Sequence, residues 1–475
     1  MLPATAWGRI AWVGLGVVVL AGIAYRPDRA LEVATGTVAH DLCSETFVAH
    51  LDPQRIFEES LRPRRGLRIV APAISWNVHF PDRTVDASIL GAFSSRARFR
   101  EGLGCVLEFG PGVMAPAIQS PPEGVNASAK DRVPALLAPI APASSEVVEP
   151  QDARLRSALD AIFAEPPEGP RRWTTSVVVL LDGRIVAERY ARGYGITTPI
   201  LGFSMTKSVM SALVGILVQK GLLRVDARAP FAAWDSPSDP RNAITVEHLL
   251  RMDSGLDLDE TGTGFDPSNR MLYDEPDMAA YAERARLIAA PATRWHYSSA
   301  STQLVARIVR DTIASTGDEV SAFARRELFE PLGMEHVTLE TDGTGTPVGA
   351  HYMLASARDW ARFGWLYACD GVLGGRRILP EGWVAFSAKP TLGTHYGAGF
   401  WLGGGGAQKP GQAVIPADAL FASGNLGQRI AIIPSLHLVV VRTGHSHGRD
   451  FDNPAFVELV EAAIDAIRPV AAPHG

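Results

Sequence analysis

The sequence predicts an α+β protein: an α/β sandwich with helices flanking one antiparallel sheet, an inserted helical lobe and a small N-terminal module. Two β-branched runs at residues 175–181 and 184–190 are joined by Asp-Gly, a strong signal for a β-hairpin. A mostly helical, loop-rich stretch follows from about residue 225 to 385, and strand-like runs return only after it. Since strands near both ends of the domain enclose a helical middle, we expect one sheet built from both ends.

The other elements of this domain follow from apolar periodicity and from capping residues. The predicted helices lie at residues 153–163, 208–221, 302–313, from 356 onward and at 454–467. The predicted late strands lie at residues 397–402, 428–433 and 436–443. The helix after Ser356 is predicted from its N-cap and the acid at position 359.

Length and composition are those of a folded protein with more than one part. A chain of 475 residues is long for one domain, so one large domain with an extra module is the natural expectation. The 47% hydrophobic and 20% charged residues are ordinary for a globular protein. A net charge of −6 without any basic run gives no sign of a nucleic-acid partner.

The N-terminus carries an apolar stretch at residues 10–25, preceded by Arg9 and followed by Arg26. A short basic region, an apolar core and small residues before a cut are the plan of a cleaved signal peptide. An uncleaved membrane anchor and a buried core helix are the alternatives. We expect residues 1–30 to be a signal peptide or an anchor. The rest of the chain is then exported, to the bacterial periplasm or facing it from the membrane.

Residues 31–110 mix strand-like runs at 67–70, 74–80 and 105–109 with turn residues, which predicts a small α+β module. Cys43 and Cys105 both lie in this module. In an exported chain we expect them to form a disulfide, which loop closure makes worth about 4 kcal/mol. Two unpaired buried thiols are the alternative. The third cysteine, at position 369, is interpreted as a small core residue.

A change of composition separates this module from the rest of the chain. Pro, Ala and Ser dominate residues 111–152, which is typical of an extended linker. The main domain is therefore expected at residues 153–470.

Within this domain, Ser204-x-x-Lys207 opens the apolar helix at 208–221. Residues three apart share one helix face, so the two side chains point the same way. A serine hydroxyl becomes a good nucleophile when a neighbouring base takes its proton. A lysine can be that base when burial lowers its pKa.

Lysine is scarce in this chain, at five positions among 45 Lys and Arg residues, so a Lys in an apolar segment stands out. Arginine could not serve as such a base, because it does not deprotonate. The alternative is a solvated Lys207 at an ordinary helix start.

Two later stretches complete a candidate site. Tyr297 precedes the predicted helix at 302–313, and a nearby cation could make its hydroxyl a general acid or base. An aromatic wedge in the core is the alternative. Residues 422–428 are small and lead into a strand, where backbone N–H groups can bind an oxyanion. An ordinary Gly-rich turn is the alternative there.

Ser204-x-x-Lys207, Tyr297-Ser298-Ser299 and Ala422-Ser423-Gly424, in this order, resemble the penicillin-recognising serine hydrolases. Within them the chain is similar to the class C β-lactamase-like branch, and specifically to 6-aminohexanoate-dimer hydrolases and related esterases. Residues 248–256 also resemble the Leu-Leu-x-Met-x-Ser-Gly-Leu segment of that branch. The resemblance covers residues from about 170 to 465 and implies fold and reaction class.

The resemblance also implies roles for individual residues. Ser204 would be the acylated nucleophile, Lys207 its base, and Tyr297 the group that passes protons to the leaving group and activates water. The backbone N–H groups of Ser204 and Asn425 would form the oxyanion hole. The remaining residues expected to line the substrate site are Ser299, Ser423 and Gly424.

Two departures from the family pattern bear on the substrate. Ser299 stands where most β-lactamases of this branch have Asn, and Ala422 stands where they have Lys or His. The Lys holds the carboxylate of a β-lactam, so its loss disfavours an efficient β-lactamase or DD-peptidase. Amides or esters without an adjacent acid are favoured.

Two other kinds of site do not fit the sequence. An α/β-hydrolase would need Gly-x-Ser-x-Gly, and residues 202–206 lack the second Gly. His445 and His447 are too few for a zinc site, so we interpret them as part of a solvated loop.

The sequence thus predicts an exported serine hydrolase that acts on a small-molecule amide or ester, with no cofactor or metal. A β-lactamase or DD-peptidase is the alternative in the same class. A catalytically silent ligand-binding envelope protein is the alternative outside it. The oligomeric state is not encoded in any of these patterns.

Overall fold

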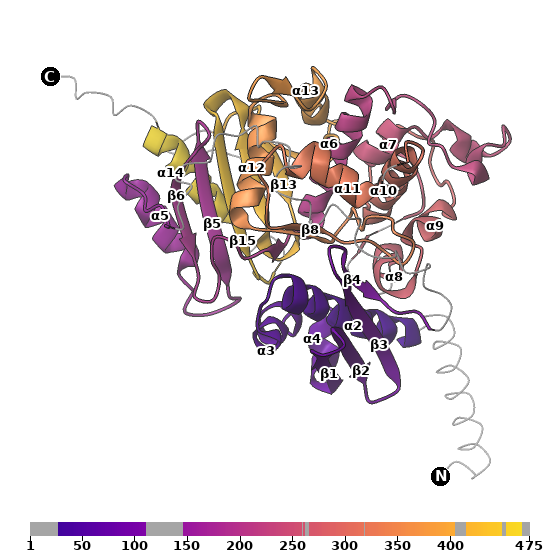
Figure 1. Cartoon of the computed structure of the whole chain (residues 1–475), viewed down its shortest axis with the longest axis horizontal. Coiled ribbons are helices and arrows are strands. Elements are labelled where there is room, and N and C mark those ends of the chain that lie inside the picture. Colours follow the sequence, from indigo (N-terminus) through magenta and orange to yellow (C-terminus); the bar gives the residue numbers. More distant parts are fainter. Residues whose placement is uncertain are drawn as a thin grey trace, which may run out of the picture.

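The computed structural model describes residues 27–110, 146–258, 260–261, 266–317, 319–403, 415–448 and 453–467. The apolar stretch at residues 10–25 and most of the predicted linker at 111–152 lie outside these ranges. Figure 1 shows a small N-terminal module below a larger domain that is built on a twisted sheet. None of the described helices is long and apolar enough to cross a membrane.

The large sheet confirms the fold class predicted from the sequence. Its strand order is β12-β13-β14-β15-β5-β6, and every neighbouring pair is antiparallel. The strands are β5 (Thr174–Leu181), β6 (Arg184–Tyr190), β12 (Trp401–Leu402), β13 (Leu420–Ser423), β14 (Arg429–Ile433) and β15 (Leu438–Gly444). Since β15 pairs with β5, the two ends of the domain meet in the centre of one sheet.

The hairpin between β5 and β6 forms as predicted. Asp182 and Gly183 both have positive φ angles, 47° and 73°, which is the conformation that a two-residue Asp-Gly turn requires.

Helices cover both faces of the sheet. They are α5 (Ala153–Phe163), α14 (Asn453–Ile467) and α12 (Ala357–Ala368). The side chains of β5 alternate between two hydrophobic layers, because successive residues of a strand point to opposite faces. Val177 and Val179 belong to the layer of α5 and α14, whereas Val178 and Leu180 belong to the layer of α12 and the helical lobe.

The inserted lobe supplies the helices on the far side of α12 (Figure 1). They are α6 (Thr206–Gln219), α7 (Val246–Arg251), α8 (Pro267–Asp274), α9 (Met278–Glu283), α10 (Ser299–Ala314), α11 (Val320–Ala324) and α13 (Trp383–Ala388). A small antiparallel sheet of order β7-β9-β8 lies beside them, with β7 (Ile200–Leu201), β8 (Val337–Leu339) and β9 (Met353–Ala355). A two-residue hairpin, β10 (Val372–Leu373) with β11 (Arg376–Arg377), follows α12.

The strand predicted at 397–402 is much shorter in the structure, where only Trp401–Leu402 pairs. The residues before it bind helix α6 instead. The hydroxyls of Ser208 and Ser211 donate to the carbonyls of Gly399 and Ala398, at 2.7 and 2.9 Å.

The N-terminal module packs one long helix, α2 (Pro27–Cys43), on a four-stranded antiparallel sheet. The strands are β1 (Ile74–His79), β2 (Thr84–Ile89), β3 (Phe93–Arg100) and β4 (Gly104–Leu107). The short helices are α3 (Pro53–Ile56) and α4 (Leu67–Val70). A disulfide joins Cys43, the last residue of α2, to Cys105 in β4.

One strand prediction in the module is wrong: residues 67–70 form α4 rather than a strand. An apolar run of four residues does not distinguish a buried helix turn from a strand. Here Pro72 follows in a 3-10 turn, so the run stays helical until β1 begins at Ile74.

Candidate active site

Ser204 lies in a strained turn at the start of helix α6. It belongs to the 3-10 turn Phe203–Met205, which continues directly into the helix. Phe203 is buried and has a left-handed φ of 48°, a conformation that bulky residues rarely adopt. Backbone strain of this kind persists where the surrounding structure enforces it, and it is concentrated at functional sites.

Lys207 is buried beside Ser204, at 2% exposure. Its ammonium group donates three hydrogen bonds: to Ser204 Oγ at 2.9 Å, to Ser299 Oγ at 3.0 Å and to the carbonyl of Ala350 at 2.8 Å. Burial lowers the pKa of Lys207 to about 8, and the nearby carboxylate of Glu260 acts in the opposite direction. A lysine with this pKa is neutral often enough near pH 7 to take a proton.

Tyr297 completes a cluster around the serine hydroxyl. Burial raises the pKa of the Tyr297 hydroxyl and so does the charge of Glu260, whereas its hydrogen bond with Ser204 lowers it. The ring stacks on Trp401 at 5.4 Å between centroids and lies 5.0 Å from Lys207 Nζ. Tyr297 is thus held by aromatic packing while its hydroxyl faces the serine.

Ser299 links the lysine to helix α10, of which it is the first residue. Its hydroxyl accepts from Lys207, and its N–H donates to Glu260 Oε2 at 2.8 Å. Glu260 was not among the residues singled out from the sequence. It lies in a loop with no motif around it, and only the fold brings its charge close to Lys207 and Tyr297.

The residues at 422–425 form a second wall at the end of β13. Ala422 is buried in the core, Ser423 is half-buried and Asn425 is exposed. A Cβ at Gly424 would overlap the carbonyl oxygen of Gly202, so only glycine lets this strand end lie against the Ser204 turn. The structure therefore gathers the three predicted stretches around one serine.

The sequence of the main domain matches a known protein family. The β-lactamase family model matches residues 159–462. The chain belongs to the β-lactamase family. A 6-aminohexanoate-dimer hydrolase of Paenarthrobacter ureafaciens is 26% identical over 245 residues, which are 48% of this chain and 61% of that relative. The match thus spans less than two thirds of the relative's length.

Two solved structures share the fold of the main domain. A family VIII carboxylesterase superposes with a TM-score of 0.54 at 17% identity, over 68% of this chain and 99% of the other. A penicillin-binding protein homologue from Caulobacter crescentus gives 0.53 at 19% identity, again over 68% of this chain and 99% of the other. The residues matched to the β-lactamase family begin after the N-terminal module.

The prediction of a solvated loop at His445 and His447 is wrong. His445 is buried and pairs with the hydroxyl of Tyr194 at 3.1 Å, and burial lowers its pKa to about 3. His447 is hydrogen-bonded to the carbonyl of Glu59 in the N-terminal module, at 2.6 Å. Among the described residues no group of three His, Cys, Asp or Glu side chains could hold a metal ion.

Proposed function

We propose that this chain is a serine hydrolase that cleaves a small amide or ester through an acyl-enzyme on Ser204. The observation that carries the proposal is the hydrogen bond from buried Lys207 Nζ to half-buried Ser204 Oγ, at 2.9 Å. A nucleophile within hydrogen-bond distance of a base with a lowered pKa is the arrangement that acyl transfer requires.

In the acylation step, neutral Lys207 takes the proton of Ser204 while Oγ bonds to the substrate carbonyl carbon. A pKa of about 8 leaves roughly one Lys207 in ten neutral at pH 7. The carbonyl oxygen becomes an oxyanion, which the backbone N–H groups of Ser204 and Asn425 would stabilise.

The leaving group departs with a proton from the Tyr297 hydroxyl, and Tyr297 recovers a proton from Lys207. In deacylation, a water attacks the ester carbonyl, and its proton passes through the same two groups to Ser204 Oγ as the bond to the acyl carbon breaks. The site thus returns to its starting state with one water consumed.

The charges near the site are of both signs. Glu260 adds a negative charge close to Lys207. Arg429, which donates to the carbonyl of Gly424 at 2.7 Å, adds a positive charge that acts to lower the pKa of Tyr297. The preference for a substrate without an adjacent carboxylate therefore rests on Ala422, which stands where most β-lactamases of this branch have Lys or His. The names of the related 6-aminohexanoate-dimer hydrolase and carboxylesterase support an amide or ester substrate.

The test is intact-mass analysis after labelling with a fluorophosphonate, followed by turnover of p-nitrophenyl butyrate and nitrocefin. We expect one adduct that Ser204→Ala abolishes, with ester turnover much faster than nitrocefin turnover. Fast nitrocefin hydrolysis would favour a β-lactamase. The absence of both adduct and turnover would favour a ligand-binding protein.

We also propose that the chain is exported. The apolar stretch at residues 10–25 and the disulfide between Cys43 and Cys105 support an oxidising compartment. N-terminal sequencing of the protein recovered from the periplasm should find a start near residue 25 if the stretch is cleaved. Full-length protein in the membrane fraction indicates an anchor, and full-length protein in the cytoplasm contradicts export.

A further inference from the structure

The N-terminal module reaches the back of the Ser204 turn, although it lies outside the residues matched to the β-lactamase family. The guanidinium of Arg64 lies 5.4 Å from the ring centroid of Phe203, the residue before the serine. Arg64 is held there by an ion pair of 2.8 Å with Asp41, which lies on helix α2. The side chain of Asp41 is fully buried. The strained Phe203 therefore packs against a cation that the module supplies.

The module also holds the segment that orients Lys207. Asp41 accepts a hydrogen bond from the hydroxyl of Tyr352, and the ring of His40 stacks on that of Tyr352 at 4.0 Å. Two residues before Tyr352, the carbonyl of Ala350 accepts from Lys207 Nζ at 2.8 Å.

Met353, the residue after Tyr352, binds the turn that carries Ser204. The carbonyl of Met353 accepts from the N–H of Gly202 at 2.8 Å. Residues 350–353 thus contact both Lys207 and Gly202 in the Ser204 turn, and Asp41 binds Tyr352 between these two contacts.

The ring of His351 connects these two contacts inside the domain. It lies edge-on to Phe203 at 4.9 Å and 4.8 Å from the ring of Tyr352. Arg64, Phe203, His351 and Tyr352 thus form one packed group. The charge of Arg64 in this group is paired with that of Asp41. Removing one partner of a buried charge pair leaves the other uncompensated, so this group resists displacement.

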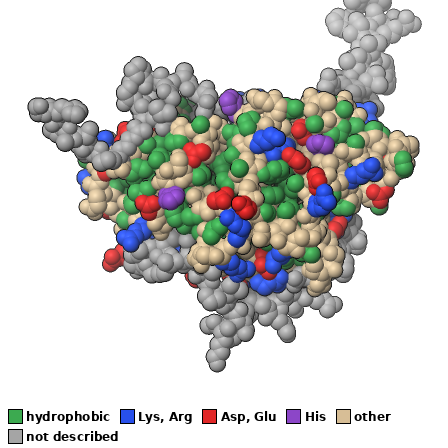
Figure 2. Space-filling view, turned by 90° about the horizontal axis from the view of Figure 1, so that it is seen from above, with side chains coloured by type: hydrophobic (Ala, Val, Ile, Leu, Met, Phe, Trp, Pro, Cys, Tyr) green, Lys and Arg blue, Asp and Glu red, His purple; other side chains and the backbone are tan. Residues whose placement is uncertain are grey.

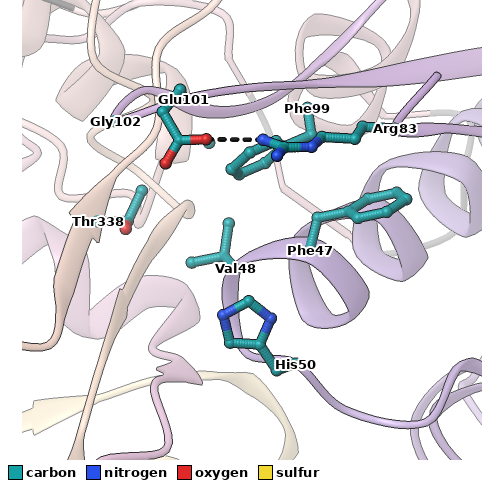
Figure 3. Close-up of a pocket in the computed structure, with 9 residues that line it drawn as sticks. Phe47, Val48, His50, Arg83, Phe99, Glu101, Gly102 and Thr338 are labelled. Atoms are coloured by element: carbon teal, nitrogen blue, oxygen red, sulfur yellow. Dashed lines mark hydrogen bonds and ion pairs between the residues drawn. The ribbon is translucent and has the colours of Figure 1, made fainter. Parts of the chain in front are cut away.

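The module and the domain also meet at a second place. A pocket of about 400 Å³ lies there, lined by Phe47, Val48 and Phe99 of the module and by Thr338 of the domain. Figure 3 shows these residues. Near this pocket, Arg100 donates to the carbonyl of Thr341 at 2.6 Å. This region offers a matched control, because its contacts join the same two parts at a different place.

We propose that the N-terminal module contributes to catalysis. Asp41 and Arg64 would be positioning residues, which hold the Ser204 turn and residues 350–353 at fixed positions relative to each other. The inference rests on the proposed function of Ser204 and Lys207. It assigns to the module the task of holding Lys207 Nζ within hydrogen-bond distance of Ser204 Oγ. A shift of about 1 Å in such a pair can cost on the order of 100-fold in rate.

The kinetic test compares Arg64→Met, Arg64→Lys and Tyr352→Phe with the control Arg100→Met in full-length protein. Each variant is assayed well below its Tm. The fraction of active enzyme is measured from the mass of the fluorophosphonate adduct. We expect Arg64→Met and Tyr352→Phe to lower kcat by about 10- to 100-fold with little change in KM, because Lys207 and Ser204 Oγ are no longer aligned with the carbonyl carbon of the bound substrate. Arg64→Lys, which keeps the charge facing Asp41, should recover part of the loss.

Arg100→Met should lower the Tm and leave kcat within about twofold of the wild type, because the hydrogen bonds of Arg100 go to Thr341 and not to residues 350–353 or the Ser204 turn. A wild-type kcat in both Arg64→Met and Tyr352→Phe would overturn the proposal. So would an equal loss of kcat in Arg100→Met, which would show that the module acts only through overall stability.

Hydrogen exchange tests the same proposal without any activity. In Arg64→Met and Tyr352→Phe, peptides that cover residues 202–207 and 350–353 should exchange faster than in Arg100→Met. Equal exchange in all three would contradict the positioning role. A wild type that shows no adduct on Ser204 would refute the proposed function alone, and the exchange result would still decide the role of the module.

Discussion

The two walls of the active site are built by different means. The helical wall, with Ser204, Lys207, Tyr297 and Ser299, is a hydrogen-bonded cluster at the starts of helices α6 and α10, in which Lys207 and Ser299 are buried. The strand wall at residues 422–425 is defined by close backbone approach, with Ala422 buried and Gly424 pressed against Gly202. The first wall holds the groups that the proposed proton transfers need, whereas the second offers shape and the backbone N–H of Asn425. We therefore propose that the helical wall carries the proton transfers and that the strand wall contributes to binding the oxyanion and the substrate.

The sharpest test of this division is Lys207→Arg. Arginine keeps the positive charge but does not deprotonate, so it cannot act as the base. We expect kcat/KM for p-nitrophenyl butyrate to fall by about 1,000-fold or more. Lys220, at the C-terminal end of α6, provides the matched control in Lys220→Arg, which should leave the rate unchanged. Retention of more than a tenth of the activity in Lys207→Arg would assign the base to another group.

A smaller loss is expected from Tyr297→Phe, which removes one hydroxyl and preserves the stacking on Trp401. The rate should fall by about 100-fold, and by more for an anilide than for a p-nitrophenyl ester, because a poor leaving group needs the proton more. Hydrolysis of matched ester and anilide pairs measures this. An equal loss for both substrates would mean that Tyr297 does not protonate the leaving group.

The strand wall can be probed with two neighbouring variants. Gly424→Ala would push a methyl group into the Gly202 carbonyl and displace the serine turn, so we expect kcat to fall by about tenfold or more. Ser423→Ala, one residue earlier, should alter KM by only a few-fold, since it changes the surface and not the backbone position. If both variants gave the same small change in KM, the strand end would not support the serine turn.

The smallest effect is expected at Glu260, which touches the helical wall through the N–H of Ser299. Its charge raises the pKa of Lys207, so Glu260→Gln should move the acid limb of the pH–rate profile to lower pH. A profile measured from pH 5 to 10 detects the shift. A midpoint that moved upward would contradict the sign of this interaction.

Much of the helical wall could be predicted from the sequence, because its signals are local. Ser204 and Lys207 share a helix face through their spacing. Outside this wall, Ser356 predicts the start of helix α12 through an N-cap that the structure contains. The hairpin at Asp182-Gly183 is similarly a property of two adjacent residues.

Other parts had no local signal. Strands β2 and β3 of the module carry many polar residues, such as Asp86 and Arg96, which form an ion pair with each other and weaken the apolar pattern of a strand. The contact between Asp41 and Tyr352 spans 311 positions of sequence, and no spacing rule reaches across such a distance.

The most direct test of the central claim is the pH dependence of Ser204 acylation. The pre-steady-state burst with p-nitrophenyl butyrate, measured from pH 5 to 10, follows acylation alone. Because only neutral Lys207 can accept the proton, the burst rate should rise with pH through a midpoint near 8 and then level off. A burst rate that does not change across this range, or a burst that survives in Ser204→Ala, would contradict the account.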